Sequence, residues 1–137
     1  MSFPVHANPG LEASEVADLL EKQTSDQPRD FLLVDVRRTD WTGGTIASSI
    51  NLPAHSLYPT RKIIYDLCKQ AGIKRIIFYC GSSNGRGPRS AAWMEDYRSE
   101  VGGELQVLIM KGGIRGFVKS YGGRLMDGYD EKAWEGS

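Results

Sequence analysis

The sequence is poor in cysteine, in histidine and in net charge, and each shortage excludes a class of protein. Its two cysteines, Cys68 and Cys80, are too few for a disulfide-stabilised scaffold, and two histidines are too few to complete a zinc site with them. Seventeen basic side chains balance seventeen acidic ones, so no overall charge attracts nucleic acid or anionic lipid. No apolar run is long enough to span a bilayer. We therefore expect no metal, no nucleic-acid partner and no membrane partner, and any anion must bind at a local site.

The composition that remains is typical of one globular domain in a reducing compartment. The chain has 137 residues, of which 40% are hydrophobic and 25% are charged, which suffices for one hydrophobic core. The opening segment, residues 1–10, has neither the basic nor the apolar region of a secretory signal. We expect one domain over residues 1–137, located in the cytoplasm or the nucleus.

Apolar runs and helical periodicity alternate along the chain, which predicts an α/β fold. Runs at 31–36, 73–79 and 105–110 are typical of strands buried on both faces, and a shorter strand is expected at 49–52. Helical spacing predicts helices between and after them, at 11–22, 60–71, 88–101 and 114–121. Such alternation implies a mostly parallel sheet with helices on both faces.

The second of these helices has clear start and stop signals. Thr60 is suited to cap its N-terminus and Gly72 to end it. Four apolar residues fall on one face of this helix: Ile63, Ile64, Leu67 and Ala71. The segment after Gly123 shows no periodicity and predicts no element.

The loop from Cys80 to Arg86 is the segment whose residues indicate chemistry. It joins the strongest strand signal to a helix start, where backbone N–H groups and the positive helix end suit a tetrahedral oxyanion. Arg86 can hold two oxygens through its planar fork, and the same positive field favours the nucleophilic thiolate of Cys80. We expect the loop residues to bind substrate, together with Arg89 one turn further on: Gly81, Ser82, Ser83, Asn84 and Gly85. Arg89 could hold a second substrate anion or lie exposed on the helix surface.

Several segments of the chain resemble the signatures of the rhodanese-fold phosphatases related to the M-phase inducer dual-specificity phosphatases. Their single-domain relatives include eukaryotic arsenate reductases. The matching segments are 33–37 with an Asp-x-Arg, 43–46, 49–53, the loop from Cys80 to Arg89, and 107–117 with a Gly-Gly pair. The resemblance covers about residues 12–122 and implies a single rhodanese-like domain with this core. It also implies that Cys80 is the nucleophile and that Arg86 binds the oxyanion.

The chain departs from this family at positions that matter for catalysis. The cell-cycle phosphatases carry glutamate beside the cysteine and just before the arginine, where this chain has Gly81 and Gly85. Val36 replaces the second cysteine that protects the first in those enzymes, so that redox switch is not expected. Cys68 is expected to be a packing residue or a bystander thiol, because it lies on a predicted helix.

Three further residues outside the loop are candidates for the site. Asp35 is expected to pair with Arg37, or to receive backbone donors, and so to support the loop from below. Asp40 is the best available general acid, since its segment is expected at the same edge of the sheet.

Four functions fit these residues. The first is a phosphatase, of the protein-tyrosine or dual-specificity type or acting on small aryl phosphomonoesters, which forms a cysteinyl-phosphate and needs no cofactor. The second is an arsenate reductase that uses Cys80 with glutathione and glutaredoxin as electron donors. The third, thiosulfate sulfurtransfer, is disfavoured because rhodaneses usually have a loop one residue shorter. The fourth is an inactive rhodanese module that binds a partner, which the presence of both Cys80 and Arg86 disfavours. The expected partner is a phosphorylated protein or a small oxyanion.

Overall fold

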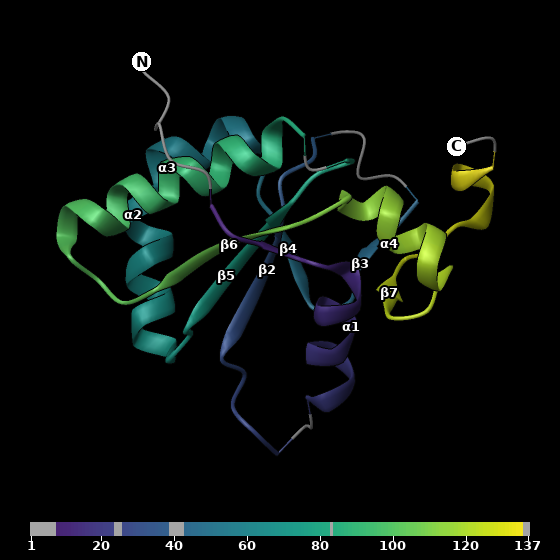
Figure 1. The fold of residues 1–137 in the computed structure, drawn as a ribbon, viewed down its shortest axis with the longest axis horizontal. Helices are drawn as coiled ribbons and strands as arrows, with labels where there is room; N and C mark the ends of the chain where they lie inside the picture. The colour runs from purple at the N-terminus through teal and green to yellow at the C-terminus, as the bar shows by residue number, and fades with distance from the viewer. Residues whose placement is uncertain (1–7, 24–25, 39–42, 83, 136–137) are drawn as a thin grey trace.

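The fold is built on a five-stranded parallel sheet, seen in the computed structural model (Figure 1). The model describes residues 8–23, 26–38, 43–82 and 84–135. The strand order is β1-β6-β5-β2-β4, and every neighbouring pair is parallel. The strands are β1 (Gly10–Leu11), β2 (Phe31–Asp35), β4 (Ser49–Asn51), β5 (Arg75–Tyr79) and β6 (Gln106–Met110). The predicted strands therefore exist, and β5, which leads to Cys80, lies in the middle of the sheet.

Helices cover both faces of the sheet (Figure 1). The helices α2 (Ala54–Ala71) and α3 (Arg86–Val101) cover one face, and α1 (Ala13–Lys22) and α4 (Gly113–Tyr121) the other. Side chains of β5 alternate between the two cores: Ile76 and Phe78 pack under α2 and α3, and Ile77 and Tyr79 under α1 and α4. The predicted α/β architecture with helices on both faces is confirmed. Within the described part of the chain, no helix has the length and apolar character needed to cross a membrane.

The helix α2 differs from the prediction in its start and in its buried face. It begins at Ala54, and Thr60 lies inside it, where its hydroxyl donates to the carbonyls of Ser56 and Leu57. Pro59 lies just ahead of Thr60 within the helix and removes one N–H donor from its backbone hydrogen bonds. The end at Gly72 is confirmed, in the left-handed conformation.

The side chains that α2 buries also differ from the predicted face. Its buried residues are Ala54, Leu57, Tyr65 and Cys68, whereas Ile63 and Leu67 are 59% and 55% exposed. The helix therefore buries a different face from the predicted one. It begins earlier than predicted, and Leu57 in this added segment lies in the core under α2 and α3.

The segment after Gly123, which showed no pattern, folds back onto the chain near Gly43. The strand β7 (Met126–Asp127) pairs antiparallel with β3 (Thr45–Ile46), and a 3-10 turn, η2, follows at Glu131–Trp134. The indole N–H of Trp134 donates to the Gly43 carbonyl over 2.9 Å. Long-range pairing orders this segment, which is why local periodicity did not reveal it.

Candidate active site

Cys80 directly follows the carboxyl end of β5 and is the first residue of the candidate active-site loop (residues 80–86). This is the edge of a parallel α/β sheet where ligands bind. Cys80 is 3% exposed and free of any disulfide. The cysteine that follows the central strand is thus buried, in the core under α2 and α3.

The side chain of Arg86 lies near Gly81, the residue that follows Cys80. Arg86 is the first residue of α3 and is half-buried. A Cβ placed on Gly81 would lie 3.8 Å from Nη2 of Arg86, so the guanidinium lies against the residue that follows Cys80. The positive end of the α3 dipole adds to the guanidinium charge. The arrangement suits binding of an oxyanion in front of a cysteine thiolate.

The helix α4 packs against the backbone of the same loop. Backbone N–H groups of Ile114 and Arg115 donate to the carbonyls of Cys80 and Gly81 over 2.9 and 3.0 Å. Gly113 makes this approach possible, since it has φ of +60° and a Cβ there would lie 2.5 Å from both carbonyl oxygens. The start of α4 thus holds the backbone of Cys80 and Gly81 in place.

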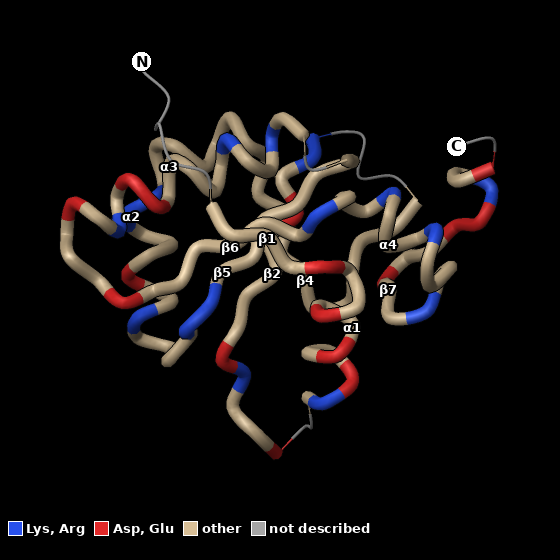
Figure 2. Tube along the Cα trace, in the orientation of Figure 1, with Lys and Arg blue, Asp and Glu red and all other residues tan. Residues whose placement is uncertain are grey.

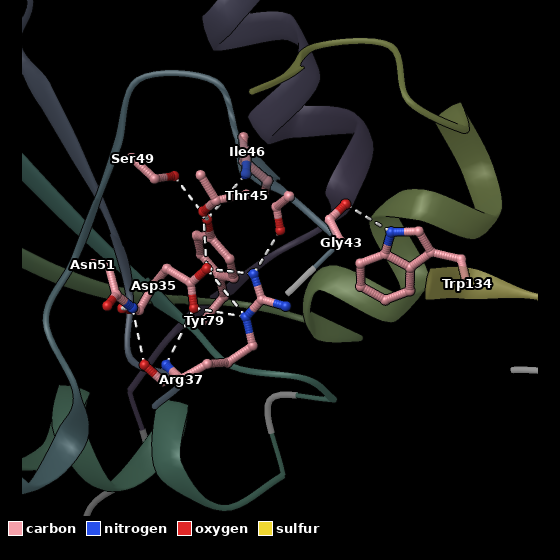
Figure 3. Close-up of polar contacts among 10 residues, drawn as sticks. Asp35, Arg37, Gly43, Thr45, Ile46, Ser49, Asn51, Tyr79 and Trp134 are labelled. Carbon is pink, nitrogen blue, oxygen red and sulfur yellow. Dashed lines mark hydrogen bonds and ion pairs between the residues drawn. The ribbon is translucent and has the colours of Figure 1, made fainter. Parts of the chain in front are cut away.

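A buried ion pair supports the site from the neighbouring strand β2 (Figure 3). The Arg37 Nη2 donates to the Asp35 carboxylate over 2.6 Å, and its Nε lies 2.9 Å from the other oxygen. Arg37 also donates to the Gly44 carbonyl over 2.8 Å, and Thr45 donates its hydroxyl to Asp35 over 2.8 Å. Both charged side chains are almost fully covered, at 2% and 0% exposed. Asp35 and Arg37 therefore join the segment 43–45 to the strand end and are not exposed to substrate.

Tyr79, the residue before Cys80, belongs to the same network (Figure 3). Its hydroxyl lies 2.7 Å from the hydroxyls of Thr45 and Ser49 and accepts from the Ile46 N–H over 3.2 Å. Burial, and secondly the charge of Asp35, raises the pKa of Tyr79 to about 12. Tyr79 therefore stays protonated at neutral pH and has a structural role.

The remaining predicted site residues lie at the loop surface or outside the described residues. Ser82, Asn84, Gly85 and Arg89 are exposed. Asp40, the predicted general acid, and Ser83 lie outside the described residues. Among the residues that the structure describes, no group of three histidine, cysteine or acidic side chains is arranged to hold a metal ion.

Cys68 lies away from the loop, in the core between α2 and the sheet. It is 3% exposed, and burial raises the pKa of its thiol to about 11. A thiol that stays protonated in an apolar core is a poor nucleophile at neutral pH.

Two residues at this site were not singled out from the sequence: Gly113 and Arg115. The sequence indicates Gly113 only within the Gly-Gly pair that resembles the family signature, although two adjacent glycines after a buried strand are themselves a sign of close backbone approach. A Cβ on Gly81 would lie 3.8 Å from Nε of Arg115, so this side chain also lies beside the loop. Only the packing of α4 brings it there, and no local signal in the sequence could have revealed it.

Residues 12–120 match the model of the rhodanese-like domain. The chain belongs to the rhodanese-like family. It is 27% identical over 112 residues to arsenical-resistance protein 2 of Saccharomyces cerevisiae, which covers 76% of this chain and 83% of the relative.

Solved structures agree with this family. The As-Sb reductase of Leishmania major superposes with a TM-score of 0.77 at 24% identity, covering 87% of this chain and 85% of that one. Ygr203w of Saccharomyces cerevisiae, described as a homolog of single-domain rhodanese and of the Cdc25 phosphatase catalytic domain, also has a TM-score of 0.77. Its identity is 22%, with 94% of this chain and 93% of that chain covered. At these identities the likeness of the structures shows the fold alone, and the resemblance to rhodanese-fold proteins is confirmed. Relatives of this rhodanese fold include phosphatase-like proteins and arsenic or antimony reductases.

Proposed function

We propose that the protein is an enzyme in which Cys80 attacks a tetrahedral oxyanion, and that its reaction is the hydrolysis of aryl phosphomonoesters. The observation that carries this proposal is the guanidinium of Arg86 lying against Gly81, directly after the cysteine at the end of the central strand. A cation in this place neutralises the charge of the substrate and of the transition state while the thiolate attacks.

The reaction has two steps. The Cys80 thiolate attacks phosphorus, the bond from phosphorus to the aryl oxygen breaks, and the aryl oxide leaves and takes a proton from water. Water then attacks the cysteinyl-phosphate, the bond from sulfur to phosphorus breaks, and phosphate leaves as the thiolate is restored. Arg86 and the loop N–H groups hold the non-bridging oxygens in both steps. Neither step needs a bound cofactor.

The leaving group decides which phosphomonoesters react. The residues between Cys80 and Arg86 include no acid, so the loop cannot protonate a departing alkoxide. Aryl oxides leave more readily without a proton, so we expect aryl phosphates to react much faster than alkyl phosphates. Phosphotyrosine in a protein or a small aryl phosphate fits this requirement.

Arsenate reduction is the second candidate, and the lack of a loop acid favours it. Cys80 attacks arsenic and displaces hydroxide, and no alkoxide has to leave. Two electrons from external thiols, glutathione and glutaredoxin, then reduce As(V) to As(III). The bond from sulfur to arsenic breaks, arsenite leaves, the Cys80 thiol is restored, and the external thiols are oxidised to a disulfide. The similarity to arsenical-resistance protein 2 of yeast supports this activity.

Sulfur transfer and an inactive module are less well supported. The five residues between Cys80 and Arg86 make a loop sized for a tetrahedral oxyanion rather than for a single sulfur atom. A module that only binds a partner needs neither the cysteine nor the arginine placed next to it.

The test is a comparison of three substrates on matched variants. Wild type, Cys80→Ser, Arg86→Ala and Cys68→Ser are assayed with 4-nitrophenyl phosphate, with arsenate plus glutathione and glutaredoxin, and with thiosulfate plus cyanide. We expect phosphate ester hydrolysis to disappear in Cys80→Ser, to fall at least a hundredfold in Arg86→Ala, and to persist in Cys68→Ser. Equal hydrolysis by wild type and Cys80→Ser would refute the proposal. Arsenate turnover without hydrolysis would replace the first candidate with the second.

A further inference from the structure

Arg115 brings a second guanidinium to the active-site loop, and the proposed reaction does not use it. Its Nε lies 3.8 Å from the point where a Gly81 Cβ would be, and Nη2 of Arg86 lies 3.8 Å from the same point. Nε of Arg115 and Nη2 of Arg86 are therefore separated by no more than twice 3.8 Å. They approach the loop from different helices, Arg86 from α3 and Arg115 from α4.

The position of Arg115 is fixed at its backbone, and its charge is available. Its N–H donates to the Gly81 carbonyl over 3.0 Å, so its Cα is held beside the loop. Its side chain is exposed, and within the described part of the chain its guanidinium makes no hydrogen bond or ion pair. Two other arginines, Arg37 and Arg124, each pair with a carboxylate.

No nearby acid in the loop balances this second charge. The five residues between Cys80 and Arg86 are uncharged, and the first turns of α3 and α4 contain no acidic residue. Figure 2 shows basic positions at the starts of both helices, whereas acidic positions follow one another along α1. The N-terminal ends of the two helix dipoles add to this positive field. Among the described residues Arg115 has no acidic partner, and such a charge next to an oxyanion site favours a second negative group on the ligand.

We propose that Arg115 is a second anion-binding residue, which selects oxyanion substrates that carry another anionic group, such as a carboxylate or a phosphate, close to the reacting centre. Arg86 serves two oxygens of the reacting group through its fork, and Arg115 serves the neighbouring anion. This inference rests on the proposed function, because it takes the reacting oxyanion to lie in the loop.

Protection of Cys80 from alkylation tests the inference without any turnover. The rate of carbamidomethylation of Cys80 by iodoacetamide is measured by peptide mass spectrometry in the presence of inorganic phosphate or of pyrophosphate, which carries a second anionic group. The variants are Arg115→Gln, Arg115→Lys and, as a control for charge on the same helix, Lys119→Gln. Lys119 is exposed one turn further along α4.

We expect pyrophosphate to protect wild type and Lys119→Gln at a concentration about tenfold lower than phosphate does. Arg115→Gln is expected to lose this advantage while phosphate protection changes less than about threefold, and Arg115→Lys to keep part of it. The inference is overturned if pyrophosphate has no advantage in wild type, if Arg115→Gln weakens both anions equally, or if Lys119→Gln has the same effect as Arg115→Gln. Failure of phosphate itself to protect wild type would overturn the proposed function as well, so the two failures are distinguishable.

Discussion

Alanine at position 113 tests whether α4 holds the active-site loop in place. Gly113 has φ of +60°, a conformation that costs a residue with a Cβ about 1–2 kcal/mol. The new Cβ would also lie 2.5 Å from two carbonyl oxygens of the loop, and no rotamer change can relieve a contact with backbone. Overpacking of this kind costs about 1–3 kcal/mol, so we expect Gly113→Ala to lower the free energy of unfolding by about 2–5 kcal/mol.

Two neighbouring glycines provide matched controls. Gly112 has φ of +78°, but its Cβ would meet only the Cα of Gly116 at 3.7 Å, so Gly112→Ala should show the backbone cost alone, about 1–2 kcal/mol. Gly116 lies inside α4 with open space around it, so Gly116→Ala should be neutral or stabilising by up to about 1 kcal/mol.

Urea unfolding and the alkylation rate of Cys80 measure the two consequences separately. Because the overlap is relieved by displacing the Cys80 and Gly81 carbonyls, Gly113→Ala should change the alkylation rate and lower hydrolysis of 4-nitrophenyl phosphate roughly a hundredfold. Gly112→Ala should leave the alkylation rate near that of wild type. Equal losses of stability in Gly113→Ala and Gly112→Ala, with unchanged alkylation in both, would show that this close approach does not constrain the loop.

Three further predictions follow from buried groups. Asp35→Ala should lower the free energy of unfolding in urea by about 3–5 kcal/mol, because it leaves the charge of Arg37 buried without its partner. Glu21→Ala removes one member of an exposed ion pair and should lower it by less than about 1 kcal/mol. Similar losses in the two variants would contradict the structure. The pKa of Tyr79 is raised to about 12 in the folded protein, from an ordinary value of 10.0. Its protonated hydroxyl therefore contributes fully to the free energy of unfolding below pH 10. As the pH rises toward 12 this contribution is lost, and the free energy of unfolding falls by about 2–3 kcal/mol. Urea unfolding measured across that pH range in a Cys68→Ser background should show this loss of stability. If the same loss occurs in Tyr79→Phe, another group is responsible for it. Iodoacetamide at pH 8 should label Cys80 faster than Cys68, because burial raises the pKa of the Cys68 thiol to about 11; rapid labelling of Cys68 in the folded protein would contradict this raised pKa.

The network around Tyr79 shows where reasoning from the sequence reached its limit. The apolar run ending at Tyr79 predicted β5, since a strand buried on both faces has a composition that can be recognised locally. The sequence also indicated Asp35 and Arg37 as a pair, because a charge inside an apolar strand needs a partner. It did not indicate that Thr45 and Ser49 would meet the Tyr79 hydroxyl, since these contacts join residues about thirty positions apart.

Local signals in the sequence are enough to predict the alternation of strands and helices and the position of Cys80 and Arg86 in a strand-to-helix loop. These features depend on apolar periodicity and on glycines such as Gly72 and Gly102 that end helices, which act within a few residues of themselves.

The segments that meet at the loop are brought together only by tertiary packing. The start of α4 contacts the loop because β6 lies beside β5, and Trp134 reaches Gly43 across 91 positions of sequence. The buried face of α2 was likewise set by how the whole helix packs and not by its own apolar pattern. Contacts of this kind arise from the packing of elements against one another, so Gly113 and Arg115 gain their roles only once the chain has folded.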